Sequence, residues 1–120
     1  MSELAGLKIL VVEDEPLIAM ALTDALTAFG CVVVGPARNL DRGMHLAEDE
    51  SIDGAILDVN LGGEMVFPLA DLLARNSMPF VYVTGYGKAV LRLCNHGSPV
   101  LQKPYSMPQL ITIVSKWRRS

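Results

Sequence analysis

Short aliphatic runs recur along this 120-residue chain, and they restrict the possible folds more than any other feature of the sequence. The runs are Lys8–Val12, Cys31–Val34, Ala55–Leu57, Phe80–Val83 and Val100–Leu101. Strands of a parallel sheet that helices cover on both faces have no polar side, so they read as continuous apolar runs rather than alternating ones. We therefore predict five strands of one parallel sheet at these positions.

Segments with apolar residues at helical spacing separate the runs. Pro16 suits a first helical turn, and Gly30 suits the end of the same helix. We predict one helix between them and four others over Leu40–Glu48, Val66–Arg75, Lys88–Asn95 and Met107–Arg118. Ser106 and Gln109 have the spacing of a capping box at the start of the last helix.

This alternation of strands and helices favours an α/β fold with right-handed crossovers. We predict a doubly wound, parallel five-stranded sheet with helices on both faces, and we expect residues 1–120 to form one domain. Ligands of such sheets bind beyond the carboxyl ends of the strands. The residues that follow the predicted strands are therefore the candidates for a functional site.

Charge and hydropathy exclude several classes of function. Ten basic residues stand against 13 acidic ones, which argues against direct DNA binding. No apolar run reaches the roughly 18 to 20 residues of a membrane span, and the start of the chain lacks the pattern of a secretory signal. We therefore expect a cytoplasmic protein without a membrane partner. Cys31 and Cys94 lack the spacing of a metal site and are interpreted as reduced thiols.

Acidic residues follow the first and third predicted strands. Glu13 and Asp14 come directly after the first strand, and Asp58 ends the third. Three carboxylates brought together raise one another's pKa unless a cation compensates. Mg²⁺ prefers oxygen ligands and keeps several waters, so Asp14, Asp58 and one backbone carbonyl just beyond Asp58 could hold it, with Glu13 acting through water. We predict a site for Mg²⁺, with Mn²⁺ as a second candidate.

A carboxylate in such a site can also act as a nucleophile. Asp58 could use its second oxygen to attack a phosphoryl group once the charge of that group is neutralised. Lys103, after the fifth strand, offers an ammonium group for this purpose. The hydroxyl of Thr84 and the backbone N–H groups near Asn60 and Gly85 could hold the remaining phosphoryl oxygens. The sequence therefore predicts phosphoryl transfer to Asp58.

With these residues after its predicted strands, the chain resembles the response-regulator receiver domain of two-component systems, over essentially its whole length. The matching residues are Glu13-Asp14, Asp58, Thr84-Gly85 and Lys103-Pro104. The resemblance implies a flavodoxin-like (βα)5 fold, Mg²⁺ bound by Asp14 and the Asn60 carbonyl, and a cis peptide before Pro104. It also implies a signalling module rather than an enzyme, which takes phosphate from a histidine kinase or a phosphotransfer protein. An unidentified downstream protein and a phosphorylation-dependent homodimer are further expected partners.

Two departures from the usual receiver pattern concern the switch. Val100 stands where most receivers carry Phe or Tyr, three residues before the lysine. The segment 79–87 and Tyr105 instead resemble a subgroup named for its Phe-Ala-Thr-Gly-X-Tyr motif, whose lone receivers commonly work with kinases of the HWE class. Because valine has no ring to swing, we expect the signal to pass through the loop that begins at Thr84 and the helix predicted after it.

Two other functions compete with a phosphoacceptor. The first is a protein-binding module of the same fold that works without phosphate and shows no response to Mg²⁺. The second is a phosphatase of the haloacid-dehalogenase type, in which an acidic residue two positions after the nucleophile donates a proton. Asn60 occupies that position, and its amide cannot serve as such an acid. His45 and His96 lack ligand-spaced partners and receive no phosphorelay role.

Overall fold

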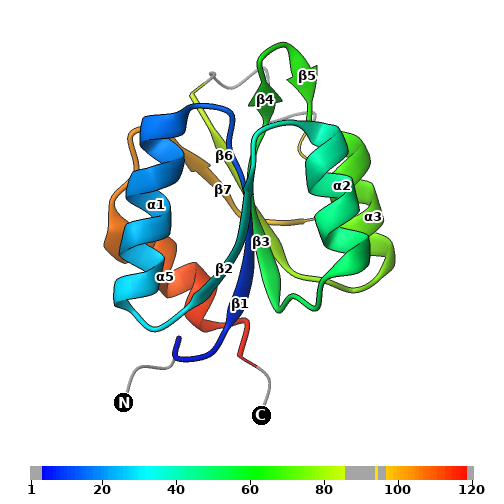
Figure 1. The fold of residues 1–120 in the computed structure, drawn as a ribbon. Helices are drawn as coiled ribbons and strands as arrows, with labels where there is room; N and C mark the ends of the chain where they lie inside the picture. Colours follow the sequence, from blue (N-terminus) through cyan, green and yellow to red (C-terminus); the bar gives the residue numbers. More distant parts are fainter. Residues whose placement is uncertain (1–3, 86–93, 95–96, 119–120) are drawn as a thin grey trace.

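The computed structural model of the protein describes residues 4–85, 94 and 97–118. Five parallel strands form one sheet in the order β2-β1-β3-β6-β7 (Figure 1). Their bounds are β1 Lys8–Val12, β2 Val32–Ala37, β3 Gly54–Asp58, β6 Phe80–Thr84 and β7 Val100–Gln102. The predicted five-stranded parallel sheet is confirmed.

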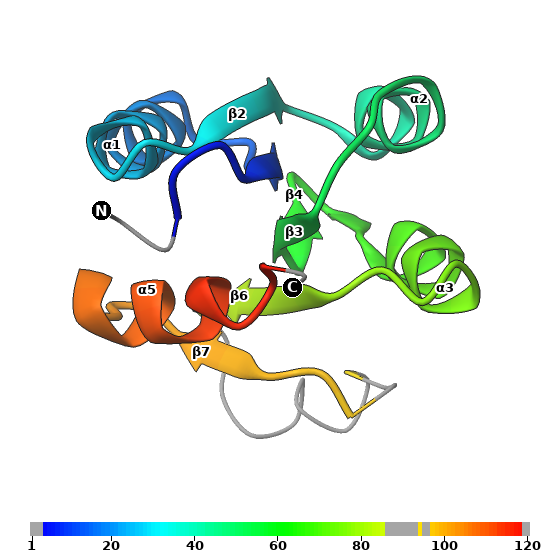
Figure 2. The same cartoon turned by 90° about the horizontal axis from the view of Figure 1, so that it is seen from below.

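Helices cover both faces of this sheet. Their bounds are α1 Pro16–Ala28, α2 Leu40–Asp49, α3 Phe67–Arg75 and α5 Met107–Ser115. Seen along the strands, α1 and α5 lie on one side and α2 and α3 on the other, which is the predicted doubly wound arrangement (Figure 2). The helix predicted over Lys88–Asn95 falls outside the described residues, Cys94 excepted. In the described part of the chain, every helix is too short or too polar to span a bilayer.

The core consists of two apolar layers separated by the sheet. Leu10, Leu57 and Tyr82 face α2 and α3, whereas Ile9 and Ile56 face α1 and α5. All residues of β3 and β6 are buried, as expected for central strands covered on both sides. Burying one such Leu or Ile side chain stabilises the fold by about 1.5 to 3 kcal/mol, so the two layers together hold the strand ends in place.

Several predicted bounds differ from the structure by one residue, and the ends of β2 and of the last helix differ by three. β2 begins at Val32 and continues through Gly35 and Pro36, because as an edge strand it tolerates a proline that lacks the ladder N–H. The last helix ends at Ser115 rather than Arg118. Trp117 follows its last turn and is buried with only 7% of its surface exposed.

A small antiparallel hairpin, which the sequence analysis did not predict, follows β3. It consists of β4 (Asn60–Leu61) and β5 (Glu64–Met65), and it projects beyond the carboxyl end of the sheet (Figure 1). Gly62 and Gly63 join the two strands with φ of 66° and 100°. Two consecutive positive φ values match a tight hairpin turn and strongly favour glycine at both positions. The hairpin places this turn beside Asp58.

Candidate functional site

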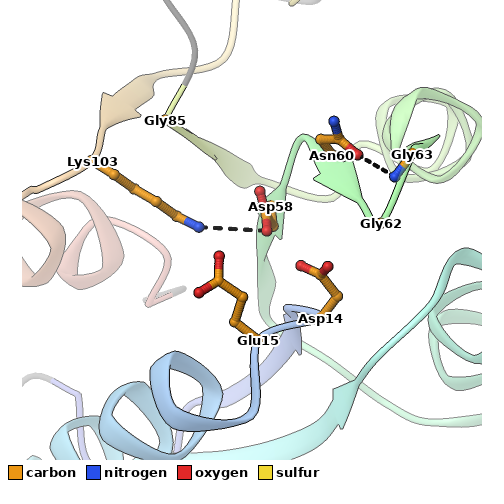
Figure 3. A pocket seen from close by; sticks show the side chains of 8 residues that line it. All are labelled: Asp14, Glu15, Asp58, Asn60, Gly62, Gly63, Gly85 and Lys103. Atoms are coloured by element: carbon orange, nitrogen blue, oxygen red, sulfur yellow. Dashed lines mark hydrogen bonds and ion pairs between the residues drawn. The ribbon is translucent and has the colours of Figure 1, made fainter.

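A cavity of about 380 Å³ lies at the carboxyl ends of the parallel strands (Figure 3). Its walls are formed by Asp14, Glu15, Asp58, Asn60, Gly62, Gly63, Gly85 and Lys103. These residues come from the segments that follow β1, β3, β6 and β7, which agrees with the general position of ligand sites in doubly wound sheets. The structure therefore brings Asp14, Asp58 and Lys103 together, as the sequence predicts.

Three carboxylates and one ammonium group form the charged centre of this site. Glu13, Asp14 and Asp58 each offer one oxygen, and these oxygens lie within 4.8 Å of one another. Lys103 Nζ donates to Glu13 Oε1 at 3.1 Å and to Asp58 Oδ2 at 3.5 Å. Glu13 and Asp58 are buried, with 4% and 6% of their surfaces exposed. A single lysine thus faces more negative charge than it can balance.

This imbalance is visible in the pKa of Asp58. Burial, together with the hydrogen bond and the charge of Glu13, raises the pKa of Asp58 from 3.8 to about 8, and the charge of Lys103 only partly opposes the rise. Burial alone would lower the pKa of Lys103, but its bond with Glu13 and the charge of Asp58 outweigh that effect and raise it. An oxygen-only donor set with excess negative charge suits a hard divalent cation. The residues present therefore fit the predicted Mg²⁺.

Asn60 reaches this site from the hairpin. Its side-chain oxygen accepts a hydrogen bond from the Gly63 N–H at 2.6 Å, which is a common role for asparagine in a turn (Figure 3). The predicted ligand of the cation is the backbone carbonyl of Asn60 rather than its side chain. The turn contact and the predicted ligand role therefore use different atoms of the same residue.

Thr84 lies next to the cavity but is not part of its wall. The residue is fully buried at the end of β6, and its carbonyl accepts a hydrogen bond from the Lys103 N–H at 2.8 Å. This bond ties the end of β6 to the start of the Lys103 segment. The Lys103–Pro104 peptide is cis, as the family resemblance implies.

An aromatic ring packs near Val100, although it comes from the neighbouring strand. Val100 pairs in register with Tyr82, whose fully buried ring makes edge-to-face contacts with Phe67 at 5.9 Å and with Phe80 at 5.2 Å. Within the described part of the chain, the Tyr82 hydroxyl finds no hydrogen-bond partner. Most of the predicted signalling segment after Gly85 lies outside the described residues.

Glu15 is a cavity residue that the sequence analysis did not single out. It precedes α1, and its carboxylate points into the cavity (Figure 3). Its backbone N–H donates to Glu13 Oε2 at 3.2 Å, which links it to the acidic cluster. Its place directly after Glu13 and Asp14, at the same strand end, was the signal that could have identified it.

The family model of the response regulator receiver domain matches residues 9–115. The chain belongs to the response regulator receiver family. The receiver is 41% identical to SdrG from Sphingomonas melonis, with a TM-score of 0.76 and 98% of both chains covered. It is 26% identical to the response regulator PhyR from Brucella abortus, with a TM-score of 0.79 over 93% of this chain and 47% of that one. Receivers are signalling modules of two-component systems.

Curated relatives of this receiver are longer proteins. The receiver is 34% identical over 87 residues to the phyllosphere-induced regulator PhyR of Methylorubrum extorquens. The match covers 70% of this chain and 33% of the relative. It thus spans about a third of that protein. The receiver domain of the Pseudomonas aeruginosa sensor histidine kinase PA1611 was solved with magnesium in its active-site cleft. It is 21% identical to this chain with a TM-score of 0.81, and the match covers 94% of this chain and 98% of that one. At this identity the likeness concerns the fold.

Proposed function

We propose that this receiver accepts a phosphoryl group on Asp58 from the phosphohistidine of a histidine kinase or a phosphotransfer protein. One observation carries this proposal: the Asp58 carboxylate lies in an open cavity between the acidic Asp14 and the ammonium group of Lys103. This arrangement of two carboxylates and one ammonium group favours a phosphoacceptor over a binding module that works without phosphate. In this proposal, residues 1–120 act as one receiver domain in the cytoplasm, with an HWE-class kinase as the donor.

Transfer begins when an oxygen of the ionised Asp58 attacks the phosphorus atom. The P–N bond to the donor imidazole breaks, and its electron pair returns to the ring nitrogen, so the histidine leaves without phosphate. Lys103 then moves part of its interaction from Asp58 to a phosphoryl oxygen, while Glu13 keeps the ammonium oriented. The backbone N–H groups beside Asn60 and Gly85, with the Thr84 hydroxyl, would bind the other phosphoryl oxygens.

Asp14, Asp58 and the Asn60 carbonyl would hold Mg²⁺, with Glu13 acting through water, and the bound ion would supply positive charge that offsets the carboxylates and the phosphoryl oxygens. The same oxygen ligands would accept Mn²⁺. The open side of the cavity leaves room for the waters that such an ion retains. A downstream protein would then read the change in structure at this edge of the sheet.

The decisive experiment is phosphorylation by a small phosphodonor with Mg²⁺, followed by intact mass. We expect one phosphoryl group on the wild-type protein and none on Asp58→Asn. Asp49→Asn, at the exposed end of α2, serves as the matched control and should be phosphorylated like the wild type. An unmodified wild-type protein, or an undiminished mass gain in Asp58→Asn, would contradict the proposal.

A further inference from the structure

The carboxylate of Glu15 has no role in the mechanism above, although it faces the same cavity as Asp58 and Lys103 (Figure 3). The side chain is exposed, so it stands at the mouth of the cavity rather than among the buried carboxylates. A phosphodonor that enters the cavity beside Glu15 comes close to this carboxylate before it reaches Asp58. Glu15 can therefore act on the donor before transfer begins.

Local structure does not explain where this carboxylate points. Glu15 is the N-cap residue of α1, with extended backbone angles of φ −85° and ψ 114°. From that position the short side chains of Ser, Thr, Asp and Asn commonly accept a bond from the first N–H groups of the helix, and glutamate is not among the preferred residues. The Glu15 side chain makes no such bond. Among the residues that the structure describes, none forms an ion pair with it.

The negative charge of Glu15 is also not needed to balance Lys103 and one divalent cation at this site. Lys103 together with one Mg²⁺, once bound, would balance the carboxylates of Glu13, Asp14 and Asp58. Glu15 adds a further negative charge, and no described basic side chain lies within ion-pair distance of it. This charge repels a phosphodonor in proportion to the donor's own negative charge, and salt weakens the repulsion because the group is exposed.

We propose that Glu15 is a specificity-determining residue that disfavours small dianionic phosphodonors and so favours a donor held at the cavity by protein contacts. The inference rests on the proposed function of Asp58. Protein contacts can offset the repulsion at the mouth, whereas a free dianion has nothing to offset it. Glu15 thus limits phosphorylation by small phosphorylated metabolites of this charge.

The test compares Glu15→Gln with the wild type, using two donors of different charge at low ionic strength and saturating Mg²⁺. With the dianion acetyl phosphate, we expect phosphorylation of Glu15→Gln to be about three- to tenfold faster. With phosphoramidate, which carries less negative charge near neutral pH, the increase should stay below about twofold. High salt should abolish the difference. Mg²⁺ titration of each variant ensures that both are compared at saturation.

Two further variants control this experiment. Glu15→Asp keeps the charge and should behave like the wild type, and Glu48→Gln removes an exposed charge from α2 and should change neither rate. Equal acceleration with both donors, or unchanged rates in Glu15→Gln, would overturn the role of Glu15 while leaving Asp58 as the acceptor. A wild-type protein that neither donor modifies would overturn both proposals.

Discussion

Asp58 is buried beside other carboxylates, and this environment should control how the metal-free protein responds to pH. Its pKa is raised from 3.8 to about 8, so between these values the folded state binds a proton that the unfolded state has released. The free energy of unfolding should therefore fall as pH rises from about 4 to 8. We expect thermal denaturation in EDTA to show a decreasing Tm over this range and a flatter profile for Asp58→Asn. An identical pH profile in the variant would contradict this prediction.

The two residues after β1 should contribute unequally to cation binding. Asp14 lines the cavity, whereas Glu13 is buried and pairs with Lys103. Removing a residue that acts through another group or through water typically weakens metal binding by about 10- to 100-fold, and removing a direct ligand should cost more. Titration with Mg²⁺ at fixed ionic strength should therefore show a larger loss for Asp14→Asn than for Glu13→Gln. Equal or reversed losses would show that the ligand assignment is wrong.

The buried hydroxyl of Tyr82 should reduce the stability of the protein. Because this hydroxyl has no partner among the described residues, its loss of hydration is not compensated. Tyr82→Phe keeps the ring contacts with Phe67 and Phe80 and should stabilise the protein by about 1 kcal/mol, or roughly 3 to 6 °C in Tm. Tyr105→Phe, at a partly exposed ring, provides the control and should change Tm less. A lower Tm in Tyr82→Phe would mean that the hydroxyl is satisfied.

At the scale of elements, α5 is fixed to the sheet by Trp117 and Gly54. A Cβ on Gly54 would clash with the Cε3 atom of Trp117, so even alanine cannot be accommodated without moving the indole. Gly54→Ala should destabilise the protein by about 2 to 3 kcal/mol in urea denaturation. The double variant Gly54→Ala/Trp117→Leu should lose less than the sum of the single losses, because the clash disappears with the indole. Additive losses would indicate that the two residues do not interact.

The sequence predicts long elements well because burial on both faces leaves unbroken apolar runs. It predicts element ends less well where local turn propensity opposes strand pairing, as at Gly35-Pro36, where turn-forming residues lie inside an edge strand. The hairpin of β4 and β5 is missed because two-residue strands carry no periodicity, and only Gly62-Gly63 marks the turn. The end of α5 is misplaced because the apolar Trp117 fits the helical pattern although it packs after the helix ends.

The site residues that the sequence predicts are those that the parallel sheet brings to one edge. Asp14, Asp58 and Lys103 are found because parallel strands bring their carboxyl ends to one edge whatever their order in the chain. The orientation of Glu15 is different, since an N-cap carboxylate can face either its own helix or the cavity. That choice depends on side-chain torsion angles, which leave no pattern in a sequence.

At the scale of the whole molecule, Lys103 should transmit the structural effect of a phosphoryl group in the cavity to the sheet. Its side chain contacts Glu13 and Asp58, and its backbone N–H bonds to the end of β6. Lys103→Ala should still bind Mg²⁺ but should lose most of the spectral change that beryllofluoride, a phosphoryl mimic, produces in the wild type. Two-dimensional NMR spectra with and without the mimic measure this change. A wild-type response in Lys103→Ala would show that another group senses the phosphoryl oxygens.

The two ends of the described chain lie at the end of the molecule opposite the β4–β5 hairpin (Figure 1), and near them Arg118 contacts Ala5, 113 positions away in the sequence. The Arg118 guanidinium donates a hydrogen bond to the Ala5 carbonyl, and Leu4 and Trp117 share one apolar layer beside it. In a protein made from residues 4–118 alone, a short covalent linker across this contact would close the chain into a ring without displacing a strand. Such a ring could be reopened at exposed residues between α2 and β3, which would change the order of synthesis of the elements while their packing stayed the same.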